Sequence, residues 1–124
     1  MDIDTIFRVI KGSLPEYGAQ LVKECASVYG FDLTSTSGSV QYTLDLSQGQ
    51  GNVEKGLPAN ANAVIKTTEQ YLKDFFLGRT SFRELFSSGK LRVQGSTGRA
   101  TRLRLSSFPS FTPDSVRKYT TPRL

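Results

Sequence analysis

The side chains that ordinarily carry catalysis are scarce in this sequence. It has 124 residues, no histidine and a single cysteine, Cys25. Without histidine, the sequence excludes Ser-His-Asp and Cys-His catalysis, most zinc sites and a proton shuttle near neutral pH. Only Lys23 lies close enough in sequence to help Cys25 form a thiolate, so a buried thiol is the simpler interpretation.

Acidic residues and glycine pairs do not supply a reactive site either. Glycines spaced two or three residues apart superficially resemble phosphate loops, but no Gly-Lys-Ser or Gly-Lys-Thr follows them. The carboxylates fall on expected outward faces or helix starts, where charge is solvated: Asp45, Glu54, Glu69, Asp74 and Glu84. We therefore expect no enzyme, no metal and no cofactor.

Alternating apolar and polar residues predict the sheet that must hold any site. Val40, Tyr42, Leu44 and Leu46 alternate with polar residues, as in a half-buried strand, and residues 28–34 alternate likewise. A serine-rich loop at residues 35–39 and a glycine turn at residues 48–51 lead to a third strand. Residues 63–67 and 91–94 add two more. The first three strands are expected to form an antiparallel meander. The whole is expected to be an α+β fold, a five-stranded, largely antiparallel sheet covered on one face by about five helices.

Helical spacing predicts an amphipathic helix at the start of the chain. Ile3, Ile6, Phe7 and Ile10 share one face, and Gly12 is expected to end the helix. Packing of this face on the sheet is the simpler interpretation, and contact with a membrane is the alternative. A separate apolar helix is expected over residues 17–23.

Two short, aromatic-rich helices are expected between the fourth and fifth strands. Thr68 can cap the first, and Ser81 with Glu84 can form a capping box for the second. Another helix is expected to begin at Ser96. The two short helices carry more large apolar residues than docking requires, so part of this surface faces either a cavity or other helices: Tyr71, Leu72, Phe75, Phe76, Phe82, Leu85 and Phe86.

Residues 78–105 carry the most distinctive pattern. Gly78 and Gly89 enclose ten residues, the run GKLRVQG follows at residues 89–95, and a small-residue turn then opens a basic, apolar helix with Ala100 and Leu103. Together with the preceding order of helix, strand, hairpin, strand, glycine turn and strand, residues 3–105 resemble the sterol carrier protein type 2 family.

That resemblance implies a lipid-binding domain over residues 1–106. In the family, the helical hairpin, the first strands and the last helix enclose a hydrophobic tunnel for sterols, fatty acids, fatty acyl-CoA or phospholipids, without a cofactor. The chain is then a non-enzymatic lipid carrier. The candidate ligand-binding residues are Phe31, Tyr42, Leu72, Phe75, Phe76, Phe82, Arg83, Leu85, Phe86, Thr97, Arg99, Ala100, Thr101 and Leu103.

The chain departs from the family where the last helix would line the tunnel. Thr97, Arg99 and Thr101 replace bulky apolar residues that relatives often carry, and Arg83 stands where a glutamine is common. These changes make one end of the tunnel more polar and favour a ligand with an anionic head. Arg83 or Arg99 could hold that head, although exposure to solvent is the alternative for either.

Basic charge is concentrated in residues 79–104. Seven arginines and lysines stand against one acidic residue, Glu84. An anionic membrane surface is therefore an expected transient partner. An RNA-binding or protein-interaction module using this basic face is the alternative. Nucleic acid is the less favoured partner, because the run KLRVQ carries no aromatic residue on which bases could stack.

The last 18 residues, 107–124, are expected to form a flexible tail, because Pro109, Pro113 and Pro122 should break any helix. Phe108 and Phe111 could fold back over the domain or the tunnel mouth. The closing residues Pro122, Arg123 and Leu124 resemble a peroxisomal import tripeptide, so an import receptor is an expected partner. An acidic start and the lack of about 20 consecutive apolar residues predict a protein of the peroxisome or the cytoplasm.

Overall fold

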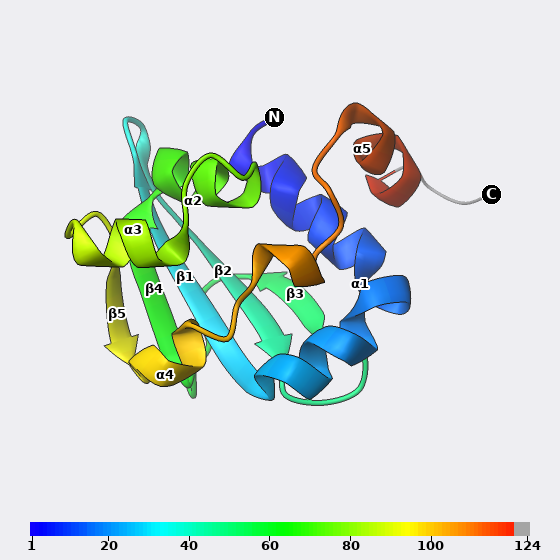
Figure 1. Ribbon diagram of the computed structural model, residues 1–124, viewed down its shortest axis with the longest axis horizontal. Coiled ribbons are helices and arrows are strands. Elements are labelled where there is room, and N and C mark those ends of the chain that lie inside the picture. Colours follow the sequence, from blue (N-terminus) through cyan, green and yellow to red (C-terminus); the bar gives the residue numbers. More distant parts are fainter. Residues whose placement is uncertain (121–124) are drawn as a thin grey trace.

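The computed structural model describes residues 1–120 and shows a five-stranded mixed sheet with helices on one face (Figure 1). The strand order is β3-β2-β1-β4-β5. The strands lie within one or two residues of their expected positions: β1 Ser27–Ser35, β2 Gly38–Leu46, β3 Asn52–Lys55, β4 Ala63–Thr68 and β5 Arg92–Gly95. The α+β class is confirmed.

The largely antiparallel sheet and the meander of β1, β2 and β3 are confirmed, and one pair of neighbouring strands is parallel. The pairs β1–β2, β2–β3 and β4–β5 are antiparallel, but β4 runs parallel to β1. The chain between β3 and β4 crosses the face of the sheet that lacks helices, where Gly30 leaves room for Leu57 and Pro58. The Asn62 side chain then accepts a hydrogen bond of 2.7 Å from the backbone N–H of Val28, which fixes the start of β4 beside β1.

The two helices expected near the N-terminus form a single helix, α1 (Ile3–Cys25). Gly12 does not end it, and Pro15 lies inside it. Proline removes one hydrogen bond and crowds the preceding turn, which bends a helix without necessarily ending it. Figure 1 shows the change of direction along α1. The bend lets both halves follow the curved sheet.

The apolar stripe of α1 packs on the sheet, as the simpler interpretation predicted. Ile6, Val9 and Ile10 are fully buried, and Ile3 and Phe7 almost so. In this conformation the stripe from Ile3 to Ile10 faces the interior of the domain. No helix within residues 1–120 combines the length and apolar character needed to cross a bilayer.

Short helices cover the rest of the same face: α2 (Glu69–Phe76), α3 (Phe82–Ser87), α4 (Thr97–Ala100) and the 3-10 turn η1 (Leu105–Ser107). Thr68, Ser81 and Ser96 cap α2, α3 and α4, each accepting a backbone N–H. The capping box at Ser81 is only half formed, because the Glu84 side chain accepts from Thr80 instead of returning to the Ser81 backbone.

An aromatic cluster fills the space between α1, α2 and the sheet. Phe7 stacks on Tyr42 with ring centroids 4.1 Å apart and meets Phe31 edge-on at 5.3 Å. The ring of Phe76, on α2, meets that of Phe7 edge-on, with the ring centroids 6.2 Å apart. Phe108 lies beyond the expected end of the domain, yet it is buried against Phe76, with the ring centroids 5.5 Å apart. The packed interior therefore extends past residue 106.

The expectation that prolines prevent any helix in the tail is wrong for residues 113–120. Helix α5 (Pro113–Thr120) packs against α1 (Figure 1). Pro113 is its first residue, where proline's fixed φ angle suits a helix and its missing N–H needs no partner. Glu16 of α1 accepts hydrogen bonds from Lys118 and Tyr119, and Tyr17 meets the Tyr119 ring edge-on.

The Gly12→Ala substitution is expected to detach α5 without unfolding the domain. A Cβ atom at Gly12 would lie 1.9 Å from the carbonyl oxygen of Tyr119, so the two helices must separate. Alanine also favours α1 by about 1 kcal/mol, which protects the rest of the fold. We expect faster hydrogen exchange and proteolysis within residues 113–120, with the domain's unfolding midpoint nearly unchanged.

Gly98→Ala is the matched control, because a Cβ atom there would meet nothing closer than the Ser96 hydroxyl at 4.0 Å. It should leave α5 as protected as in the wild-type protein. Equal protection of α5 in the Gly12→Ala protein would contradict the proposed close contact between α1 and α5.

Candidate functional site: an apolar pocket beside the third helix

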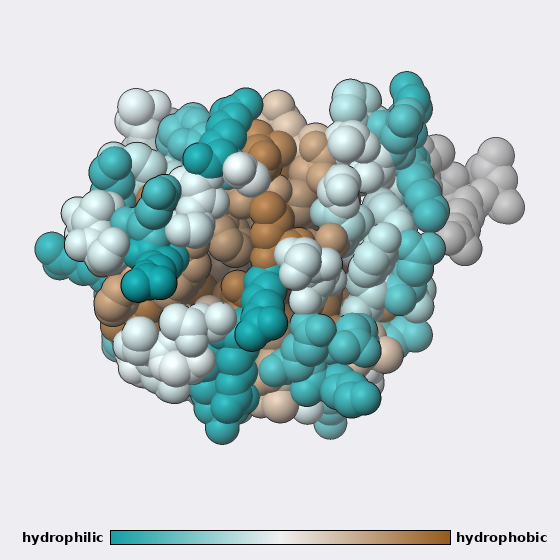
Figure 2. All heavy atoms as spheres, viewed as in Figure 1, coloured by the Kyte–Doolittle hydropathy of each residue, from teal (hydrophilic) through white to brown (hydrophobic). Residues whose placement is uncertain are grey.

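An open pocket of about 630 Å³ lies between α3, α4 and the chain that follows α4. Figure 2 shows apolar side chains at the base of this hollow, with hydrophilic groups around its rim. Its volume falls within the roughly 300–1,000 Å³ typical of small-molecule sites. Phe75, Phe82, Phe86, Leu103 and Leu105 supply most of the apolar wall. The pocket suits a molecule with a substantial apolar body.

Half of the predicted ligand-binding residues line this pocket. They are Phe75, Phe82, Arg83, Phe86, Thr97, Thr101 and Leu103. Six others are buried in the packed interior behind it: Phe31, Tyr42, Leu72, Phe76, Leu85 and Ala100. The pocket opens to the surface. The enclosed tunnel that the family resemblance implies stays a prediction.

Five lining residues were missed by the sequence analysis: Gly78, Thr80, Ser81, Arg104 and Leu105. Arg104 and Leu105 follow α4 directly, and the basic run of residues 79–104 could have drawn attention to Arg104. Gly78, Thr80 and Ser81 form the loop that enters α3. Small loop residues carry no signal of a cavity, because their role is to leave space.

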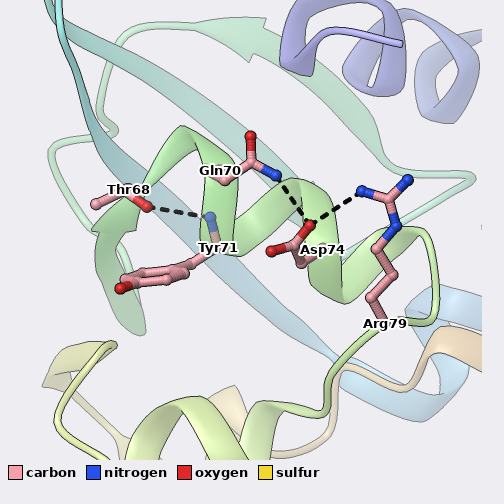
Figure 3. A network of polar contacts seen from close by, with 5 residues as sticks. All are labelled: Thr68, Gln70, Tyr71, Asp74 and Arg79. Atoms are coloured by element: carbon pink, nitrogen blue, oxygen red, sulfur yellow. Dashed lines mark hydrogen bonds and ion pairs between the residues drawn. The ribbon is translucent and has the colours of Figure 1, made fainter.

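A polar network fixes the loop that positions α3 (Figure 3). The Asp74 carboxylate accepts hydrogen bonds from Gln70 at 2.9 Å and from the Arg79 guanidinium at 3.3 Å. The Arg79 backbone N–H also donates to the Asp74 carbonyl oxygen. Between them Gly78 has a φ angle of +78°, a value that favours glycine. This turn directs α3 along one wall of the pocket.

Arg99 lies away from the pocket. Its guanidinium donates to the Ala26 carbonyl oxygen at 3.0 Å and to the Ser27 hydroxyl at 2.9 Å. The Tyr29 hydroxyl donates to the Arg99 carbonyl oxygen at 2.6 Å. Arg99 therefore joins α4 to the end of α1, a structural role that the sequence analysis did not anticipate. Arg83 is exposed at the pocket and is the better candidate to meet an anionic head.

Cys25 is buried, as the sequence analysis expected. Burial raises the pKa of its thiol, and the thiol donates a long hydrogen bond of 3.6 Å to the Arg102 carbonyl oxygen. The Arg102 guanidinium in turn donates to the Cys25 carbonyl oxygen. A raised pKa disfavours the thiolate form that a nucleophile needs.

The basic residues of the 79–104 run do not gather on one face. Arg79 pairs with Asp74, and the Lys90 ammonium lies 5.4 Å from the centre of the Tyr71 ring. Arg92 lies beside Lys66 on the helix-free face of the sheet. Arg99 and Arg102 bind the end of α1, which leaves Arg83 and Arg104 at the pocket. This dispersal disfavours an RNA-binding face.

A second hollow of about 590 Å³ lies at the start of α1 and α2. Asp2, Glu69 and the hydroxyls of Thr34, Thr36 and Thr68 are among its lining residues. This wall is more polar in side-chain type than that of the α3 pocket, and its two carboxylates outnumber its one cation, Lys73, which disfavours an anionic ligand. Within residues 1–120, no group of three or more acidic or cysteine side chains could hold a metal ion.

A five-stranded sheet with one helical layer, and an open apolar pocket within that layer, define a class of small α+β binding domains. The chain belongs to the SCP-2 sterol transfer family, whose model matches residues 7–105. The family resemblance inferred from the sequence is therefore confirmed.

One related protein and two solved structures are similar to this chain. Peroxisomal multifunctional enzyme A of Dictyostelium discoideum is 29% identical over 99 residues, which are 79% of this chain and 22% of that protein. Sterol carrier protein 2 of Yarrowia lipolytica, in its apo form, has a TM-score of 0.69 at 26% identity, covering 79% of this chain and 90% of that one. Palmitated SCP2L2 of Aedes aegypti has a TM-score of 0.69 at 19% identity, and the match covers 82% of this chain and 90% of that one. At that identity the likeness shows the fold alone.

Proposed function

We propose that this protein binds a lipid in the pocket beside α3 and transfers it between membranes or partner enzymes. The observation that carries the proposal is an open pocket of about 630 Å³ with an aromatic wall, in a chain of the SCP-2 sterol transfer family. The palmitated neighbour from Aedes aegypti is consistent with an acyl chain as the apolar body.

Apolar contact alone gives the affinity that a carrier needs. Each buried methylene contributes about 0.8 kcal/mol, so enclosing about ten gives roughly 8 kcal/mol, the scale of micromolar binding. Much tighter binding would slow release, because affinity differences reside mainly in the dissociation rate. A pocket that holds its ligand by apolar contact suits reversible binding and release of a lipid.

The proposal involves no catalysis. The chain has no histidine, and the pKa of its one thiol is raised. The chain spans only about a fifth of the length of the multifunctional enzyme that it matches, 22%, so the name of that enzyme describes a much larger protein. We infer that the present domain holds a lipid and that any chemistry on the lipid belongs to other domains or proteins.

The head of the ligand is proposed to be anionic. Arg83 and Arg104 both line the pocket and are exposed at its rim. Within residues 1–120 neither forms a salt bridge with a carboxylate. Guanidinium groups bind carboxylates and phosphates with paired hydrogen bonds. Fatty acids, fatty acyl-CoA and acidic phospholipids therefore fit this rim better than a sterol.

Displacement of a fluorescent fatty acid from the purified protein tests the function. We expect saturable, one-to-one, micromolar binding, with palmitate and palmitoyl-CoA competing better than cholesterol. Absence of binding would overturn the proposal and leave a protein-interaction module as the remaining interpretation.

Two arginine variants test the position of the head. Arg83→Met is expected to weaken fatty-acid binding about tenfold, because methionine keeps the apolar stem and removes the charge. Arg99→Met should leave affinity unchanged and lower the free energy of unfolding by about 1–2 kcal/mol, because it removes the bonds to Ala26 and Ser27. Equal losses of affinity in both variants would contradict this assignment.

A peroxisomal or cytoplasmic location also stays a prediction. The Dictyostelium relative is named as peroxisomal, while the tripeptide Pro122, Arg123 and Leu124 lies outside the described residues. Fluorescent fusions with and without the tripeptide measure its use by an import receptor. A cytosolic signal from both would count against it.

A further inference from the structure

Helix α3 is attached to the domain by little buried surface. Of its six residues, only Leu85 is buried. Gly78 and Gly89 precede and follow it with φ angles of +78° and +76°, so both connections turn sharply. The helix forms part of the pocket wall while most of its surface faces solvent.

The exposed side of α3 carries an aromatic pair. The Phe86 side chain is 43% exposed and stacks on the half-buried Phe82, with ring centroids 6.1 Å apart and planes 11° from parallel. Among residues 1–120, the other exposed large apolar residues are Met1 and Leu57, which lie outside the helices and strands in other parts of the chain. A pair of aromatic rings at a pocket rim is the kind of exposed apolar patch that marks an interaction site.

The charge around this pair is positive. Arg83 lies on α3 itself, and Arg104 lies on the chain that lines the same pocket. Glu84, the acidic residue of α3, accepts one hydrogen bond from the Thr80 hydroxyl at the start of the helix, and its single negative charge leaves the two arginines in excess. Phenylalanine rings can enter the boundary between lipid headgroups and acyl chains, and neighbouring arginines attract acidic lipids. Most apolar residues of the amphipathic helices α1 and α2 are buried against the rest of the domain.

We propose that α3 is the surface through which the protein docks on an anionic lipid bilayer, with Phe82 and Phe86 entering the headgroup boundary. The mouth of the pocket then faces the membrane, and a lipid can pass without crossing water. This inference rests on the proposed lipid-carrier function and adds the surface of the protein that contacts the membrane.

The chain has no tryptophan, so a single substitution gives a specific probe. The Phe86→Trp protein is to be mixed with vesicles of equimolar phosphatidylcholine and phosphatidylglycerol and, separately, with vesicles of phosphatidylcholine alone. We expect a blue-shifted emission and quenching by brominated acyl chains only with the acidic vesicles, weakening as salt is raised. Leu57→Trp is the matched control, because Leu57 is 40% exposed on the opposite face of the sheet. Its emission should not shift.

Vesicle sedimentation gives an independent measurement. Phe86→Ser is expected to weaken binding to the acidic vesicles about tenfold, and Leu57→Ser to leave it unchanged. Equal losses in both variants, or a shifted Leu57→Trp emission, would overturn the assignment to α3. If the wild-type protein binds soluble fluorescent fatty acid but no acidic vesicle, the docking inference fails and the carrier function stands. Failure to bind the soluble ligand is instead a failure of the carrier function.

Discussion

Replacing Phe76 by alanine is expected to lower the free energy of unfolding by about 3–5 kcal/mol. Phe76 is almost fully buried and its ring contacts four others, those of Phe7, Phe75, Phe108 and Phe111. Alanine would leave a cavity between α1, α2 and the chain after η1. These three segments cannot all move inward together to fill it. Chemical denaturation monitored by circular dichroism measures the change.

Phe86→Ala is the control for this prediction, since it removes the same ring from a site that is 43% exposed. Its cost should be below about 1 kcal/mol, as for most surface substitutions. If the two variants are equally stable, the aromatic cluster around Phe76 does not form the centre of the core. Loss of the Phe108 and Phe111 contacts should also expose residues 108–120 to hydrogen exchange in the Phe76→Ala protein.

Phe82→Asp is expected to weaken fatty-acid binding about 100-fold, or roughly 3 kcal/mol. Phe82 lines the pocket, so an aspartate there would set a carboxylate against the apolar body of the ligand and against its anionic head. Phe82 is also the first residue of α3, where an acidic side chain is favourable for the helix. The loss should therefore appear in binding and not in folding.

Phe82→Leu is the matched variant, because it keeps an apolar side chain on the pocket wall. It should bind fatty acid within about threefold of the wild-type protein, a difference of less than 1 kcal/mol. Unchanged affinity in the Phe82→Asp protein, with its circular dichroism spectrum intact, would place the ligand elsewhere than beside α3.

The interpretation of the strands and of the helix caps from sequence was largely correct. The alternation of Tyr42, Leu44 and Leu46 predicted β2, and Thr68 and Ser81 cap the helices that they were expected to cap. These features depend on the chain's own periodicity and on bonds between residues three apart. They are therefore present in the local sequence.

Helix α1 and helix α5 show where local rules failed. Gly12 and Pro15 are ordinary signals of a helix end, but both lie inside α1, and Pro113 starts a helix that it was expected to prevent. The packing of α1 on the sheet outweighs the local preference. The parallel pairing of β4 with β1 also depends on contacts distant in sequence, such as that of Asn62 with Val28.

By itself, the sequence determined the fold class, the family and the region that holds the pocket, because periodicity, glycine positions and turn residues are local properties. Only the tertiary structure separated Phe82 and Phe86 at the pocket from Phe31 and Phe76 in the core. A buried and a pocket-lining phenylalanine are identical in sequence. What distinguishes them is whether neighbouring elements fill the adjacent space, and distant parts of the chain decide that by packing together.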